Sequence, residues 1–113
     1  MKLEIRSIWS PDLDPPSEGV PSDLEDFEVL MQVAVSEVGR PGEEVFGFTV
    51  YSSSALPRVT TDRFVSHTLV LDRFSWSRLK QRLEKLFLHV DSCEDWEGVL
   101  KKLSCYLEYA DEW

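Results

Sequence analysis

The chain has 113 residues, of which 42% are hydrophobic and 12% aromatic, and its formal net charge is −9. This composition excludes intrinsic disorder, and the length predicts a single domain over residues 1–113 with its own hydrophobic core. The surplus of negative charge repels nucleic acid and anionic membranes, so we expect neither as a partner.

The first element that the sequence predicts is a short strand. Leu3 and Ile5, followed by Trp9, alternate with polar residues, as in a strand with one buried face. Pro11 ends this strand, and the prolines that follow it cannot donate to a strand ladder. We therefore expect residues 10–26 to form a loop.

A β-hairpin is predicted next. Apolar side chains occupy every second position over residues 27–35 and again over residues 46–50. Between these runs, residues 39–42 read Gly-Arg-Pro-Gly, a composition that favours a turn. A fourth, largely apolar strand is predicted over residues 64–71.

The spacing of apolar residues then changes from two to three and four. Ser75 is a suitable N-cap, and the pattern after it predicts an amphipathic helix near residues 75–91. Ser92 and Asp95 resemble a capping box for a second helix near residues 93–105.

Together these elements predict an α+β fold. We expect an antiparallel sheet of about four strands with two C-terminal helices on one face, and hairpins rather than crossovers between the strands. The aromatic tail, residues 106–113, is predicted to lie extended against the sheet. Neither a secretion signal nor a membrane span is evident in the sequence, which indicates a cytoplasmic protein.

Few residues could form a metal or thiol site. Cys93 and His89 could act as nucleophile and base, but no third group or oxyanion loop accompanies them. With His67 and Cys105 they do not give the paired spacings of zinc ligands. The second predicted helix would hold the two cysteines about 18 Å apart, too far for a disulfide. We therefore expect no catalytic residues, no metal and no other cofactor.

The most unusual feature is an acidic segment. Every charged side chain between Arg6 and Arg40 is a carboxylate. Such runs often serve only solubility, but apolar residues lie beside this one, and apolar anchors ringed by charge are typical of protein interfaces. We therefore predict a surface that binds a basic protein, formed by Trp9, Asp12, Asp14, Glu18, Asp23, Glu25, Asp26 and Glu28.

Several short motifs occur in an order that covers nearly the whole chain. They are Lys2-Leu3-Glu4-Ile5 with Ser10-Pro11-Asp12, Phe46-Gly47-Phe48-Thr49-Val50-Tyr51-Ser52, Arg73-Phe74-Ser75-Trp76, Trp96, and Tyr106-Leu107-Glu108-Tyr109. In these motifs the chain resembles the immunity protein 8 family of bacterial polymorphic-toxin systems.

The resemblance implies a non-enzymatic antidote, a cytoplasmic protein that binds the C-terminal domain of its cognate toxin and neutralises it. The negative charge suits a toxin domain with a basic surface. An acidic adaptor or regulatory module that binds another protein is the alternative, and a small enzyme that uses Cys93 is a third interpretation. The oligomeric state is left open by the sequence.

Overall fold

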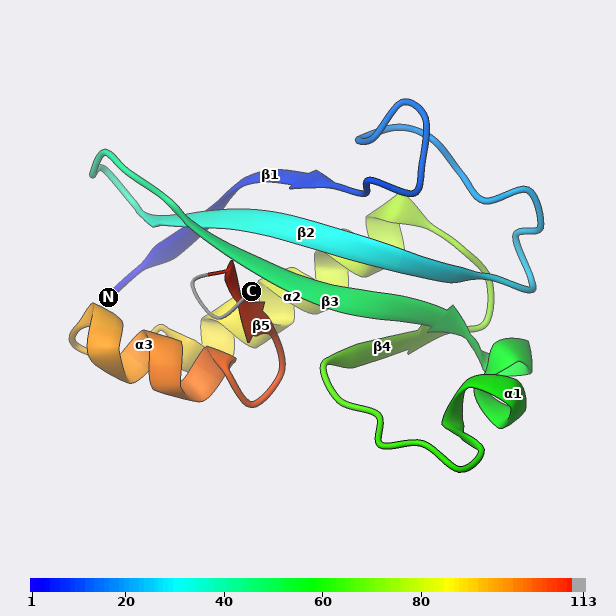
Figure 1. The fold of residues 1–113 in the computed structure, drawn as a ribbon. Coiled ribbons are helices and arrows are strands. Elements are labelled where there is room, and N and C mark those ends of the chain that lie inside the picture. Colours follow the sequence, from blue (N-terminus) through cyan, green and yellow to red (C-terminus); the bar gives the residue numbers. More distant parts are fainter. Residues whose placement is uncertain (111–113) are drawn as a thin grey trace.

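A computed structural model describes residues 1–110 and has the predicted α+β fold (Figure 1). Four of the five strands in the described residues precede the long helices, and the helices lie mostly in the C-terminal half. In chain order the elements are β1 (Leu3–Trp9), β2 (Glu28–Glu37), β3 (Glu44–Ser52), the 3₁₀ helix η1 (Ser53–Ala55), α1 (Leu56–Thr60), β4 (Thr68–Leu71), α2 (Trp76–Val90), α3 (Trp96–Leu103) and β5 (Glu108–Tyr109).

Strands β1, β2 and β3 form the antiparallel part of the sheet. The predicted hairpin between β2 and β3 is confirmed, and Gly39 and Gly42 in its turn have the positive φ angles that favour glycine. In β1 the register shifts between Ile5 and Ser7. Because side chains alternate between faces, this irregularity places Trp9 on the face opposite Ile5.

The connection after β3 differs from the expected hairpin. β4 runs parallel to β3, and the chain reaches it through η1 and α1, which the sequence reasoning did not predict. β4 is also shorter than predicted, because it begins at Thr68 rather than at residue 64. His67 has a positive φ angle, which is incompatible with a strand that continues through it from residue 64.

The tail follows the prediction as far as the structure describes it. β5 pairs antiparallel with β3 through Phe46 and Gly47, on the same edge of β3 that β4 occupies further along. The ring of Tyr109 lies 5.4 Å from that of Phe46, measured between centroids. Residues 111–113, which complete the predicted tail, lie outside the described residues.

The hydrophobic core lies between one face of the sheet and the two long helices. Alternate residues of β2 and β3, such as Met31 and Phe48, pack with Leu79 of α2 and Leu103 of α3. In Figure 1, α2 crosses behind the sheet. Within residues 1–110 no helix covers the other face of the sheet, and we call it the open face.

Both long helices form where predicted, with one correction at an N-terminus. Ser75 caps α2 by accepting a hydrogen bond from the backbone N–H of Arg78. The cap of α3 is Asp95, not Ser92, and its carboxylate accepts a hydrogen bond from the Gly98 N–H at 2.9 Å. Helix α3 is consequently shorter than the predicted range of 93–105.

Candidate partner-binding surface

Most of the acidic segment is the loop of residues 10–27 between β1 and β2, which lies at the end of the sheet. It leaves β1, passes the N-terminus of α2 and enters β2 beside α1 (Figure 1). Two contacts fix its first half, because the indole N–H of Trp76 donates to the Gly19 carbonyl and the N–H of Ser10 donates to the Pro16 carbonyl, at 2.8 Å and 2.9 Å. The loop is thus attached to both the sheet and α2.

Asp12 has a structural contact of its own. Its carboxylate accepts a hydrogen bond from the backbone N–H of Leu30 at 2.8 Å, and the hydroxyl of buried Ser10 donates to the Leu30 carbonyl. Both backbone groups of Leu30 therefore find side-chain partners just beyond the last β1 residue, Trp9. The side chains of Ser10 and Asp12 thus take the place of the backbone hydrogen bonds that β1 can no longer make where Pro11 ends the strand.

The structure brings cations to two of the predicted acidic residues. Asp26 pairs with Arg58 of α1 at 2.9 Å, and Glu25 pairs with Arg73, just before α2, at 3.2 Å. All four side chains are substantially exposed, so these pairs contribute little to stability. They do neutralise part of the charge that the sequence segment alone suggested.

The remaining acidic residues divide into two groups. Asp23 uses its carboxylate locally, accepting a hydrogen bond from the Glu25 N–H at 2.9 Å. Within residues 1–110, the carboxylates of Asp14, Glu18 and Glu28 have neither an ion pair nor a hydrogen bond, and all three residues are exposed. Asp12 and Asp23 have no cation partner in this part of the chain either, so the segment keeps an uncompensated negative charge on these five residues.

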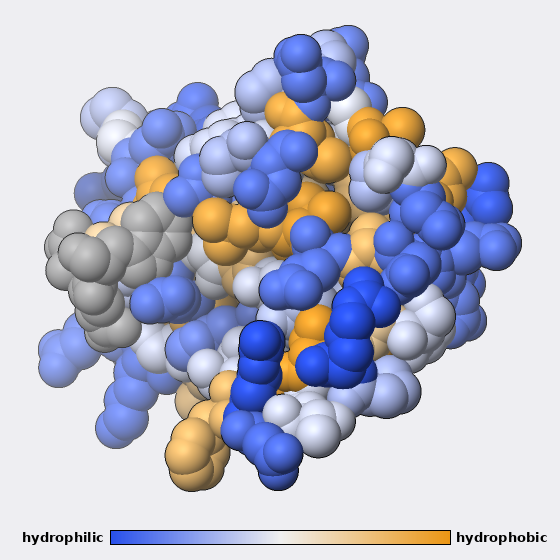
Figure 2. Space-filling view, turned by 45° about the vertical axis from the view of Figure 1, so that its right-hand side comes forward, coloured by the Kyte–Doolittle hydropathy of each residue, from blue (hydrophilic) through white to orange (hydrophobic). Residues whose placement is uncertain are grey.

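The open face adds two apolar residues, Leu30 and Val70, to the predicted Trp9. Leu30 and Val70 are 39% and 40% exposed there, and half-buried Trp9 lies across from Gln32 on the same face. Figure 2 shows hydrophobic side chains gathered in patches between hydrophilic ones. In the sequence, Leu30 stands between Glu28 and Gln32 at positions of β2 that face away from the core. A large apolar residue at such a position is the signal that could have identified it.

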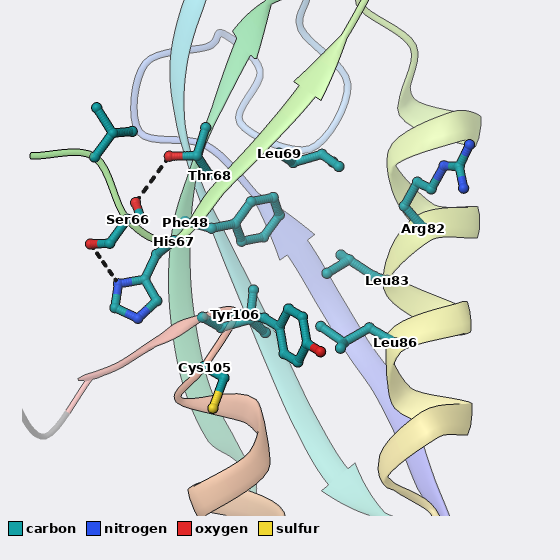
Figure 3. Close-up of a pocket in the computed structure, with 12 residues that line it drawn as sticks. Phe48, Ser66, His67, Thr68, Leu69, Arg82, Leu83, Leu86, Cys105 and Tyr106 are labelled. Atoms are coloured by element: carbon teal, nitrogen blue, oxygen red, sulfur yellow. Dashed lines mark hydrogen bonds between the residues drawn. The ribbon is translucent and has the colours of Figure 1, made fainter. Parts of the chain in front are cut away.

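A separate groove of about 450 Å³ lies between β4, α2 and the segment after α3. In Figure 3, Phe48 and Tyr106 point toward the leucines of α2, while the His67 ring lies to the side, next to Ser66. His67 Nε2 lies 2.9 Å from the carbonyl oxygen of Ser104 and therefore donates to it, and Nδ1 lies 3.4 Å from Ser66 Oγ. Both ring nitrogens thus have partners, and His67 connects the start of β4 to the end of α3.

The described residues offer little for metal or thiol chemistry. Cys93 and Cys105 are free thiols, one half-buried and one exposed. Across residues 1–110, no group of three or more His, Cys, Asp or Glu side chains is arranged to hold a metal ion. None of the helices in this part of the chain is both long enough and apolar enough to cross a membrane.

Comparison with known proteins gives one match. The family model described as immunity protein 8 matches residues 3–112, which is nearly the whole chain. No curated protein matches the chain, and no solved structure does.

Proposed function

Because the chain belongs to the immunity protein 8 family, we propose that it binds the C-terminal domain of a cognate bacterial toxin and neutralises it as a non-catalytic inhibitor. Membership of this family implies that the chain is an immunity protein directed against a toxin. The supporting observation in this chain is the set of exposed, unpaired carboxylates of Asp14, Glu18 and Glu28. Of these, Glu28 lies in β2 two residues before Leu30, an apolar residue of the open face.

This arrangement suits a toxin domain with a basic surface. Unpaired carboxylates attract such a surface over long range and raise the association rate constant. Apolar side chains that lose water on contact slow dissociation, since most binding energy comes from a few desolvated anchors. The acidic residues and the open face would therefore contribute to different rate constants.

The first experiment measures direct binding and protection. The full chain is co-expressed with the C-terminal domain of the toxin that the adjacent gene encodes, and cell survival and complex formation are recorded. We expect protection through a direct complex. If the chain neither binds nor protects against that domain, the proposal is wrong, and an acidic adaptor for another protein becomes the better interpretation.

The second experiment tests the role of the unpaired carboxylates. Replacing Asp14, Glu18 and Glu28 with Ser should slow association, most strongly at low salt, because screening shortens the reach of charge to about 10 Å at 0.1 M. The control variant removes the same amount of charge elsewhere, through Glu43, Glu84 and Glu94 to Ser. Equal association rates for the two variants would show that only net charge matters and that these three carboxylates have no special position.

A further inference from the structure

Gly47 lies in the middle of β3, where its presence needs a physical reason. Glycine weakens a strand interior, and there it often marks a bulge or a close approach by another group. The register between β2 and β3 is continuous through the pair Gln32 and Gly47, so there is no bulge in this pairing. Gly47 is also not among the residues with positive φ. Its backbone conformation is therefore not one that requires glycine.

A hollow lies at Gly47 on the open face, where the glycine contributes no side chain. Gly47 pairs with Gln32 on one side and with Glu108 of β5 on the other. The hollow over it measures about 260 Å³ and is lined by Leu30, Gln32, Gly47, Phe48, Thr49, Ser66, His67 and Glu108. It is smaller than the roughly 300–1,000 Å³ of typical small-molecule sites, and a single side chain from another protein is a better match.

The residues that line the hollow indicate which kind of side chain it could hold. Leu30 supplies an apolar wall and is partly exposed, whereas Glu108 supplies an exposed carboxylate on the opposite side of Gly47. Gln32 and Thr49 add a side-chain carbonyl and a hydroxyl oxygen, both of which can accept hydrogen bonds. Lysine and arginine combine an apolar stem with a cationic head, and they bury the stem while the head reaches an acceptor.

We propose that the hollow over Gly47 receives a lysine or arginine side chain from the toxin domain, with the stem against Leu30 and the cation at Glu108. This inference rests on the proposed function and places the hollow within the interface with the toxin domain. It adds a specific contact to the general attraction of the acidic segment. Asp12, held against the backbone of Leu30, and Glu28, which lies two residues before Leu30 in β2, place further negative charge near this site.

The main test fills the hollow. The Gly47→Thr variant should fold with a thermal midpoint equal to or above that of the unmodified chain, since threonine suits a strand better than glycine. Its affinity for the toxin domain should fall by about tenfold or more, as expected when an anchor loses its pocket. The control Ser7→Val adds bulk at an exposed position on the same face of β1, outside the hollow, and should bind normally.

A second variant keeps the inference testable if Gly47→Thr does not fold. Glu108→Lys should weaken binding by about tenfold or more, while Glu84→Lys, with the same change in charge on exposed α2, should have a much smaller effect. If the unmodified chain binds the toxin domain but folded Gly47→Thr, or Glu108→Lys, binds as tightly as its control, the inference is wrong and the proposed function stands. If the unmodified chain does not bind at all, both are overturned.

Discussion

The carboxylate of Asp12 accepts a hydrogen bond from the backbone N–H of Leu30 at 2.8 Å. This contact joins the acidic segment to β2 beyond the end of β1, and it gives a residue predicted for partner binding a structural role as well. Replacing Asp12 with Ala would release the loop at this point and leave the Leu30 N–H to water.

We expect Asp12→Ala to lower the free energy of unfolding by about 0.5–1.5 kcal/mol, the usual net value of one hydrogen bond. Chemical denaturation measures this change. Asp14→Ala removes the same charge from an exposed residue of the same loop and should leave stability nearly unchanged. Equal losses in the two variants would indicate a general effect of charge instead of the Leu30 contact.

Ser52 should matter more, because it is fully buried. Its hydroxyl oxygen accepts a hydrogen bond from the Phe27 N–H at 3.0 Å, and its own N–H donates to the Phe27 carbonyl at the same distance. Ser52→Ala leaves the Phe27 N–H buried without a partner, which should cost about 1–3 kcal/mol of unfolding free energy. Exposed Ser53→Ala is the neighbouring control, and a Ser52 variant no less stable than it would contradict the prediction.

The caps of α3 can be tested by a direct comparison. Asp95→Ala should lower the free energy of unfolding by about 1 kcal/mol, the usual effect of removing an N-cap. Ser92→Ala should have little effect, since Ser92 is exposed and lies before the capping residue. Thermal or chemical unfolding of both variants measures the difference, and a larger loss for Ser92 would restore the capping box predicted from the sequence.

Phe64 is fully exposed in the loop that leads to β4. Phe64→Ser should therefore leave the thermal midpoint unchanged. An exposed aromatic residue on a loop that also lines the hollow over Gly47 is a natural anchor for a partner, so affinity for the toxin domain should fall severalfold. Exposed Leu88→Ser, on the outer side of α2, is the control. Unchanged affinity in Phe64→Ser would place this loop outside the interface.

The sequence by itself determined the elements that depend on local physics. The alternation over residues 27–35 and 46–50, with glycines at a turn between them, is enough to specify a hairpin with one buried face. Ser75 followed by apolar residues at spacings of three and four likewise specifies the start and buried side of α2. These signals lie within short stretches of chain, so no knowledge of distant contacts is needed to interpret them.

Tertiary structure alone decided what depends on segments distant in sequence. The apolar residues of β4 carry no information on strand direction. Its parallel pairing arises because η1, α1 and the loop after them return the chain along β3 before β4 begins. The acidic segment contains no cation, yet Arg58 and Arg73 reach Asp26 and Glu25 once the chain is folded.

The hollow over Gly47 is the clearest case. Its walls come from β2, β3, the loop before β4, and β5, and residues so far apart in the chain are brought together only by the pairing of strands. A glycine in an alternating stretch indicates that a side chain is missing. Whether neighbouring side chains fill the space or leave it open is a property of packing, which the order of residues does not encode locally.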